Sequence, residues 1–322
     1  MTSSEWDAAI EVLRTATDVT LACHVNPDGD ALGSLLGLSR ALANRGARTY
    51  PTWGTTPLPD VSNFGFLPGL DTLVQPGEVP VTPVFIALDC GAADRLGDIE
   101  PLARKAEVLV NIDHHPGNEG FGTINVVHPD ASSTAELVMR LLRDAGLEID
   151  QVMATLLYTG IVTDTGRFSY VNTSPNTLRL AADLLETGVS APDLARELFE
   201  SAPFGYLKLV GRVLDRAELA ADERFVHSWI TQQDLKDTDV ALAETDRLVD
   251  LIRGTAAVDV AALFKEQMDG RWRVSLRSKT RGIADFARAR GGGGHELAAG
   301  FTARDRDSTV EELKAALRNP SA

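Results

Sequence analysis

Cysteine is scarce in this sequence, which has only Cys23 and Cys90 among its 322 residues. Two cysteines cannot build the disulfide framework of a small secreted protein, and they fit the reducing cytoplasm. Long apolar runs are missing too, because none approaches the about 18 residues that a transmembrane helix requires. Residues 1–18 (MTSSEWDAAIEVLRTATD) indicate an amphipathic helix without the basic and apolar regions of a signal peptide. We therefore expect a cytoplasmic protein with no membrane partner.

Positive charge is also in short supply. The 31 Lys and Arg residues are outnumbered by 46 Asp and Glu residues, which gives a formal net charge of −15 at pH 7. Proteins that grip long nucleic acids carry a basic surface, because neutralisation of phosphates supplies most of their non-specific affinity. This balance argues against a long duplex as a partner. A phosphate-bearing substrate should be small and held by a local site.

The first half of the sequence alternates predicted strands and helices. Strands are predicted at 19–23 (VTLAC), 84–90 (VFIALDC) and 107–113 (EVLVNID), and helices near 30–45, 133–145 and 150–164. Such alternation is typical of an α/β domain with a doubly wound, mostly parallel sheet.

The pattern changes after a stretch rich in Gly, Ser and Pro. Downstream, strands are predicted at 225–230 and in VDVAALFKEQ and RWRVSLRS on either side of the turn MDG. We therefore expect one domain at 1–187, a linker at 188–202 and a second, smaller α/β domain at 203–322.

Acidic and histidine residues follow the apolar elements of the first half. His24, Asp28 and Asp30 follow the first strand, Asp89 ends the second, and the sequence DHHPG follows the third. Asp164 closes an apolar helix. Side chains at the carboxyl ends of parallel strands meet at one edge of the sheet, where several carboxylates would repel each other unless cations lay between them.

Oxygen ligands with a few imidazoles fit Mn²⁺ first and Mg²⁺ as the alternative, and the number of carboxylates is sufficient for two ions. Two divalent metal ions can clamp the attacking and leaving oxygens of an in-line displacement at phosphorus. Taken singly, Asp28 or Asp30 could be an ordinary turn or helix-cap residue. Their combination with His24 favours the metal site. Cys23 and Cys90 adjoin it but should be small core residues.

Five ordered motifs carry a family resemblance: HVNPDGDALGS, LDC, DHHP, TDTGRFSY, and RSK with GGGGHELAAG far downstream. The chain resembles the DHH phosphoesterases with a DHH-associated C-terminal domain, of the nanoRNase, pAp-phosphatase and cyclic-di-AMP phosphodiesterase type. The motifs run from residue 24 to 301, which is nearly the whole chain.

The resemblance implies roles for individual residues. His24, Asp28 and Asp89 would bind one metal, and Asp30, Asp89, His114 and Asp164 would bind the other, so that Asp89 bridges them. Asp113 would orient a histidine, and His115 would face the phosphate or the leaving oxygen. Substrate would be held by these residues: Arg167, Ser133, Arg277, Ser278, Gly293, Gly294 and His295.

Two of these assignments have structural alternatives. Ser133 and Glu136 in SSTAE fit a helix capping box, whose amide groups could also bind a phosphate. The glycine run at 291–294 could be a flexible linker, although glycines also let a backbone approach an anion.

The resulting hypothesis is a metal-dependent phosphohydrolase of short nucleotides. Its substrates would be short oligoribonucleotides such as pApA and nanoRNA, cyclic dinucleotides such as cyclic-di-AMP, or 3′-phosphoadenosine 5′-phosphate (pAp). The alternatives are a RecJ-type single-strand exonuclease, an inorganic pyrophosphatase of the DHH superfamily and a nucleotide-sensing module without turnover. The resemblance also implies a homodimer.

Overall fold

The computed structural model describes residues 3–59 and 61–318, without the side chains of Ser3, Ser62 and His295. It divides into two compact units, Met1–Leu198 and Phe199–Ala322. The division falls inside the stretch predicted as a linker, and much of that stretch is helical in α7 (Ala191–Phe199). The predicted domain limits stay a prediction. No helix among the described residues is long and apolar enough to cross a membrane.

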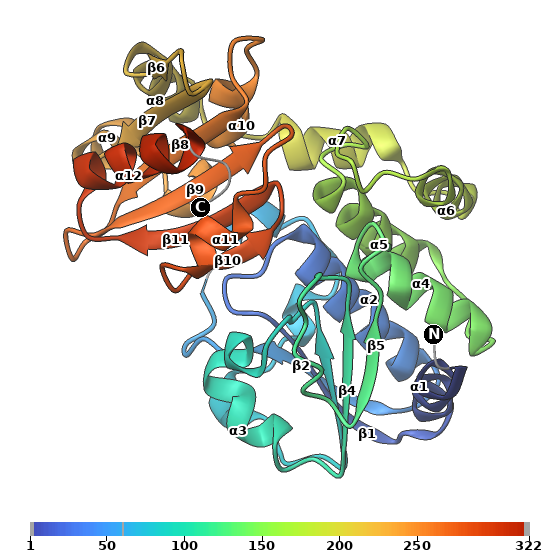
Figure 1. Cartoon of the computed structure of the whole chain (residues 1–322). Coiled ribbons are helices and arrows are strands. Elements are labelled where there is room, and N and C mark those ends of the chain that lie inside the picture. The colour runs from blue at the N-terminus through green and yellow to red at the C-terminus, as the bar shows by residue number, and fades with distance from the viewer. Residues whose placement is uncertain (1–2, 60, 319–322) are drawn as a thin grey trace. The chain divides into compact units, whose positions relative to one another are not determined.

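The first unit is built on a five-stranded parallel sheet. Its strands are β1 (Asp18–Cys23), β2 (Arg48–Trp53), β3 (Val84–Leu88), β4 (Val108–Asp113) and β5 (Ile124–Val127), in the order β2-β1-β3-β4-β5. Every pair of neighbouring strands is parallel. The predicted doubly wound sheet is confirmed, and all three predicted strands are present (Figure 1).

Helices cover both faces of this sheet. One face carries α2 (Gly29–Asn44), α4 (Thr134–Asp144) and α5 (Gln151–Asp164), with α1 (Ser3–Thr15) beside β5 and α4. The other face packs against the 3-10 segment η4 (Ala93–Ile99) and α3 (Glu100–Ala103), which share one apolar cluster with β1 and β3. Both faces are therefore buried, as the uninterrupted apolar strands VTLAC and VFIAL require.

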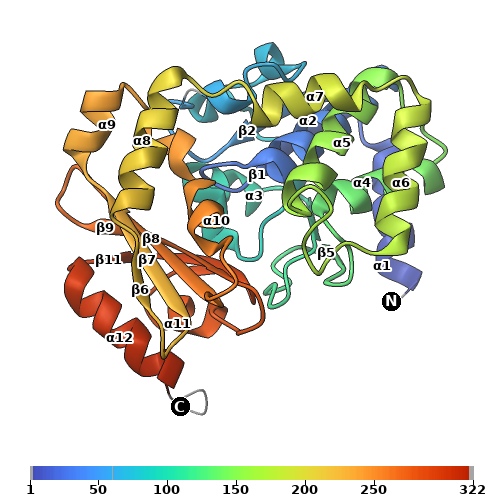
Figure 2. The same cartoon turned by 90° about the horizontal axis from the view of Figure 1, so that it is seen from above.

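Glycines bring α2 and α5 unusually close, and the two helices run side by side in Figure 2. A Cβ atom on Gly33 would lie 2.3 Å from the backbone oxygen of Leu156, and one on Gly160 would lie 2.7 Å from a carboxylate oxygen of Asp30. The close approach places Asp30, at the start of α2, beside the last turns of α5. It therefore helps to build the acidic cluster described below.

Two strands of this sheet, β2 and β5, were not predicted from the sequence. β2 (RTYPTW) contains Pro51, which a central strand would not accept, and β5 has only four residues. Both are at the edges of the sheet, where a missing N–H group or a short strand costs little. With β2 in place, the chain leaves β1 on one side and returns through β3 on the other. The carboxyl ends of β1 and β3 thus form the topological switch point, the usual ligand-binding position of such sheets.

The second unit is a mixed six-stranded sheet in the order β10-β11-β9-β8-β7-β6. Its strands are β6 (Glu218–Ala220), β7 (Phe225–Ile230), β8 (Val260–Glu266), β9 (Trp272–Ser278), β10 (Gly293–His295) and β11 (Ala298–Ala303). One apolar cluster joins α8 (Phe204–Asp215) and α10 (Leu248–Arg253) to one face, and another joins α11 (Ala284–Arg288) and α12 (Arg306–Arg318) to the other. The second, smaller α/β domain is confirmed. The elements outside the two sheets include α6 (Pro175–Glu186) and α9 (Gln232–Thr238).

The glycine run forms part of this sheet. Gly293–His295 pair with Ala298–Gly300 in an antiparallel hairpin. A Cβ on Gly292 or Gly294 would lie within 2.5 Å of the backbone oxygen of Gly300 or Ala298, respectively. Gly294 also has φ +126°, which side chains rarely adopt. The linker alternative is therefore wrong, because these glycines allow a close strand pairing.

Candidate active site

The predicted acidic and histidine residues of the first unit come together at the carboxyl edge of the sheet. They lie in the turns after β1 and β3, in the first turn of α2, at the end of β4 and just after it, and in the last turn of α5. Three groups of potential metal ligands result, and in each group the ligand atoms lie within 4.8 Å of one another. The groups are His24, Asp28 and Asp89; Asp30, His114 and Asp164; and Asp89, His114 and His115.

The first group lies at the switch point between β1 and β3. His24 Nδ1 is 2.9 Å from the backbone oxygen of Val25, and His24 Nε2 is 3.5 Å from an Asp89 carboxylate oxygen. A proton on Nδ1 would satisfy the carbonyl and leave the Nε2 lone pair directed at the acidic cluster, which is the arrangement a metal ligand needs. Asp28 also caps α2, since its Oδ1 accepts hydrogen bonds from the amides of Asp30 and Ala31. The cap and ligand interpretations of Asp28 are therefore compatible.

The second group is more deeply buried. The Nδ1 atom of His114 is 3.3 Å from the backbone oxygen of Ala131, and its Nε2 atom is 3.5 Å from Asp164 and 3.9 Å from Asp30. The Asp30 carboxylate also accepts hydrogen bonds from the amides of Thr134 and Ala135 at the start of α4, at 2.7 and 2.9 Å. These bonds fix the orientation of Asp30.

Asp89 belongs to two of the three groups and has an uncommon backbone. Its φ is +59°, in the left-handed region that a residue with a side chain normally avoids. His24 Nε2 lies 3.5 Å away, and His114 Nε2 and His115 Nδ1 both lie 3.6 Å away. Strained backbone of this kind concentrates at functional sites, where surrounding contacts hold it in place.

His115 differs from the other two histidines because a carboxylate, Asp113, holds its Nδ1 atom at 2.7 Å. Burial lowers the pKa of His115, but this hydrogen bond and the charges of Asp89, Asp113 and Asp164 outweigh it and raise the pKa to about 9. Its side chain is 26% exposed, against 3% for His114, so it is the histidine that a ligand can reach. His115 can thus carry a proton at neutral pH.

The carboxylates of the cluster are buried close together, so that their negative charges repel each other. Burial, followed by the charges of neighbouring aspartates, raises the pKa of Asp30 well above its ordinary value. Burial likewise raises the pKa of Asp164 to about 7, against the opposing effect of His114. Burial also acts to raise the pKa of Asp89, but the histidines around it lower that pKa overall. Buried oxygen donors in this number fit divalent cations, which would remove the mutual repulsion.

Sequence reasoning missed the residues that support the cluster. The Thr134 hydroxyl donates to Asp89 at 2.9 Å, and Asn118 donates to Asp113 at 2.6 Å. Asn172 donates to the backbone oxygen of Asp164, and the Arg95 guanidinium lies beside the His24 ring. Asn118, in DHHPGN, had a signal, because a polar residue in a turn beside a buried acid is a natural partner. Arg95 lies in η4 and had none.

The helix start SSTAE differs from the predicted capping box. Ser133 Oγ does accept a hydrogen bond from the Glu136 amide, but the Glu136 carboxylate accepts from Ser132 instead of Ser133. Ser133 is fully buried, and the next two amides bind Asp30. This geometry favours a structural task for the helix end, and the assignment of Ser133 to substrate binding stays a prediction.

Other predicted residues of the first unit fall near the cluster or behind it. Arg167 is exposed in the turn after α5, with φ +61°, three residues beyond Asp164. Cys23 and Cys90 are both fully buried, as expected of core residues, and burial raises their pKa well above the usual range. A raised pKa favours the neutral thiol, which suits a core residue.

The downstream motifs RSK and GGGGH meet in the second sheet, because β9 and β10 flank β11. Arg277 pairs with Ala298, which in turn pairs with His295. Gly293 and Gly294 occupy the same short strand as His295, whose side chain lies outside the described part of the structure. Ser278 is buried, and its hydroxyl accepts from the Arg281 amide. The two motifs are therefore neighbours despite the residues between them.

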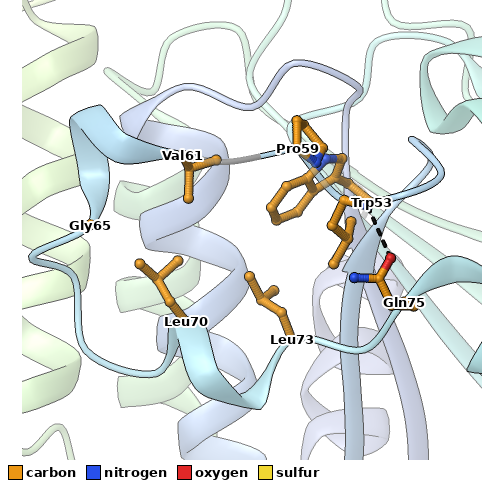
Figure 3. Close-up of a pocket in the computed structure, with 8 residues that line it drawn as sticks. Trp53, Pro59, Val61, Gly65, Leu70, Leu73 and Gln75 are labelled. Atoms are coloured by element: carbon orange, nitrogen blue, oxygen red, sulfur yellow. Dashed lines mark hydrogen bonds between the residues drawn. The ribbon is translucent and has the colours of Figure 1, made fainter.

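A separate hollow of about 290 Å³ lies beside the end of β2 (Figure 3). Its described lining is Trp53, Leu58, Pro59, Val61, Gly65, Leu70, Leu73 and Gln75. The Gln75 side chain accepts a hydrogen bond from the Leu58 amide at 3.0 Å, and none of these lining residues is acidic or a histidine. The hollow thus has no share in the acidic cluster.

Comparison with known proteins agrees with the geometry. The model of the DHH family N-terminal domain matches residues 18–161, and that of the DHHA1 domain matches residues 222–319. A bifunctional oligoribonuclease and PAP phosphatase NrnA from Thermus thermophilus is 35% identical, over 96% of this chain and 92% of its own. The chain belongs to the DHH family. The resemblance inferred from the motifs is confirmed.

Two further comparisons each cover nine tenths or more of the chain. The protein of the same name from Bacillus subtilis is 32% identical over 90% of this chain and 91% of its own. The crystal structure of an exopolyphosphatase-related protein from Bacteroides fragilis superposes with a TM-score of 0.89 at 25% identity, over 99% of this chain and 96% of that one. Both DHH and DHHA1 parts thus have counterparts in single relatives of similar length.

Proposed function

We propose that this chain is a metal-dependent hydrolase of phosphate esters in short nucleotides, with pApA, nanoRNA and pAp as its substrates. The observation that carries the proposal is the cluster of four aspartates and three histidines at the switch point of the sheet. Its support from comparison is the similarity to relatives named oligoribonuclease and PAP phosphatase, over about nine tenths of their length. Cyclic-di-AMP is a further candidate substrate.

The proposed metal sites follow the geometric groups. His24, Asp28 and Asp89 would hold one divalent ion, and Asp30, Asp89, His114 and Asp164 the other, with Mn²⁺ proposed before Mg²⁺. When bound, two such ions polarise a phosphoryl oxygen and lower the pKa of a water molecule, so that hydrolysis proceeds at neutral pH. The protein's share is to hold these six side chains in position. The bonds from Thr134 and Ala135 to Asp30 serve this purpose.

His115 would donate a proton to the leaving oxygen, and Asp113 would hold His115 in position. The carboxylate of Asp113 fixes the His115 ring through Nδ1 and keeps it protonated at neutral pH. A protonated imidazole of moderate exposure can donate to an oxygen that gains negative charge as the ester bond breaks. In this scheme His115 is a catalytic residue and Asp113 a positioning residue.

The second unit would supply substrate recognition. Arg277, Ser278, Gly293, Gly294 and His295 are proposed to bind the phosphate or base of the nucleotide, and Arg167 of the first unit to assist. Arginine suits this task because its planar group forms paired hydrogen bonds with phosphate oxygens. Glycine backbone at Gly293 leaves room for an anion, since a Cβ there would have no neighbour within 4 Å.

The test is a substrate panel measured on the full chain with Mn²⁺. It contains pApA, pAp, cyclic-di-AMP, pyrophosphate and an RNA of about 24 nucleotides at equal concentration. We expect the highest kcat/KM for pApA or pAp. Fastest hydrolysis of pyrophosphate would favour the pyrophosphatase alternative, and of the long RNA the exonuclease alternative. Tight nucleotide binding without product release would favour the sensing module.

A further inference from the structure

The face of β9 that carries Arg277 holds a second arginine. Burial alternates along this strand. Val274, Leu276 and Ser278 are buried, whereas Arg273 is exposed and Ser275 and Arg277 are half-buried. Arg273, Ser275 and Arg277 therefore share one face, with Arg273 and Arg277 about 13 Å apart along the strand.

Small residues lie beside these side chains. In the register of the sheet, Arg277 pairs with Ala298, Ser275 with Gly300, and Arg273 with Thr302. Gly300 pairs in turn with Gly293 of β10, the strand that lies beside β11 in Figure 1. Ala298, Gly300 and Gly293 add almost no side-chain bulk to the sheet beside Ser275 and Arg277.

The carboxylates nearest to the two arginines lie at the long end of ion-pair distance. Arg277 Nε lies 3.9 Å from Asp250 and has no hydrogen-bond partner of its own, while Arg277 Nη1 donates to the backbone oxygen of Leu276 at 3.0 Å. Arg273 Nη2 lies 4.0 Å from Asp246. The main partner of Asp246 is the buried Lys265, which hydrogen-bonds to it. A phosphate could therefore approach either guanidinium without first breaking a short ion pair.

We propose that Arg273 is a second phosphate-binding residue, used by oligonucleotides longer than a dinucleotide. The inference rests on the proposed function, in which Arg277 holds the phosphate of the shortest substrates. The separation of the two guanidinium-bearing residues, with Ser275 between them, is similar to the span of two successive phosphodiester links in an extended strand. Arg273 would thus add affinity for tri- to pentanucleotides and none for pApA.

The test compares Arg273→Gln with Arg271→Gln in the full chain. Arg271 is the matched control, because it precedes the same strand, carries the same charge and is paired with Asp269 at 2.6 Å in the turn. For each protein, kcat/KM is measured with pApA and with 5′-phosphorylated tetraadenylate. The affinity of a phosphorothioate analogue of each ligand is measured at several salt concentrations.

We expect Arg273→Gln to lower kcat/KM for the tetranucleotide by about tenfold and to leave that for pApA within about twofold. The slope of log K against log salt should become shallower by about 0.7 for the tetranucleotide alone, because one phosphate contact is lost. Arg271→Gln should change neither value.

Three results would overturn the inference: equal losses on both ligands, no loss on either, or the same loss in Arg271→Gln. A wild-type chain that hydrolyses neither ligand would instead refute the proposed function. In that case the salt slopes for the two analogues still decide whether Arg273 contacts a phosphate.

Discussion

At the scale of single residues, Asp89 connects the histidines of the cluster. Its carboxylate lies within 3.6 Å of ring nitrogens of His24, His114 and His115. It also accepts a hydrogen bond from the Thr134 hydroxyl. No other residue belongs to both a group with His24 and a group with His114 among the residues described. A change at Asp89 should therefore disturb every part of the cluster at once.

We expect Asp89→Ala to abolish turnover of every substrate, with a loss of more than a thousandfold, because both proposed metals lose a ligand. His115→Ala should cost far less, since the metal ligands remain. The measurements are kcat for pApA and the metal content of the purified variants. Activity of Asp89→Ala within about tenfold of wild type would contradict the two-metal assignment.

Gly293 offers a residue-scale test of substrate contact that leaves the fold undisturbed. A Cβ there meets nothing within 4 Å, and the same holds for Gly211 in the exposed part of α8. Gly293→Ala should fold normally but lower kcat/KM for pApA by about tenfold, because the methyl group occupies the space left for an anion. Gly211→Ala should stabilise the protein by about 0.5–1 kcal/mol and leave turnover unchanged. Unchanged activity in both variants would remove Gly293 from the substrate site.

At the scale of elements, the predictable parts are those whose residues depend on a local pattern. The strands β1, β3 and β4 and the helices α2, α4 and α5 have unbroken apolar runs or helical periodicity, and each is present close to its predicted limits. β2, with its proline, and β10, with its glycines, lack such a signal. Their strand conformation comes from pairing with β1 and β11, which a local pattern does not contain.

The same division applies to the site. His24, Asp28, Asp89 and His114 could be predicted because turns after parallel strands converge. The contacts of Thr134 and Arg95 with these residues could not, because they depend on how α4 and η4 pack against the sheet.

The junction of α8 and α9 should make the second unit sensitive to acid. Asp234 is buried and binds Arg216 and Arg212 of the α8 region, and it also caps α9 through Thr231. Burial acts to raise its pKa, but the hydrogen bonds from Arg216 and Thr231 outweigh it and lower the pKa well below the usual range. A lowered pKa contributes stability above the unfolded-state value of about 3.9, and this stability is lost as the pH falls below it.

Asp234→Asn should therefore lower the free energy of unfolding by about 3 kcal/mol at pH 7 and by much less near pH 2. The comparison is made by urea unfolding at several pH values, followed with a probe in the second unit. A destabilisation that does not change with pH would mean that packing, and not the charge of Asp234, holds the two helices together.

At the scale of the whole molecule, the two units are proposed to have separate tasks. The acidic cluster lies entirely in the first unit, whereas the arginines of β9 and the glycine hairpin lie in the second. The net charge of −15 opposes the binding of long nucleic acids, while the arginines of β9 supply a local positive charge for short ones. The predicted homodimer and the cytoplasmic location stay predictions.

This division predicts that Arg277→Ala affects only real nucleotides. The loss of a charge-assisted phosphate contact costs roughly 1.5–3 kcal/mol, so kcat/KM for pApA should fall by about ten- to a hundredfold. Slow hydrolysis of bis-p-nitrophenyl phosphate and the metal content should change little. An equal loss on the small ester would place Arg277 in the catalytic machinery.

The most direct measurement is the release of AMP from pApA by the full chain after chelation and then during titration with Mn²⁺, with bound metal counted in parallel. The cluster predicts no turnover in the chelated protein and recovery of activity as two ions bind per chain. Turnover that persists in the chelated protein would contradict a metal-dependent hydrolase at this site. So would turnover by Asp89→Ala when that variant binds no Mn²⁺.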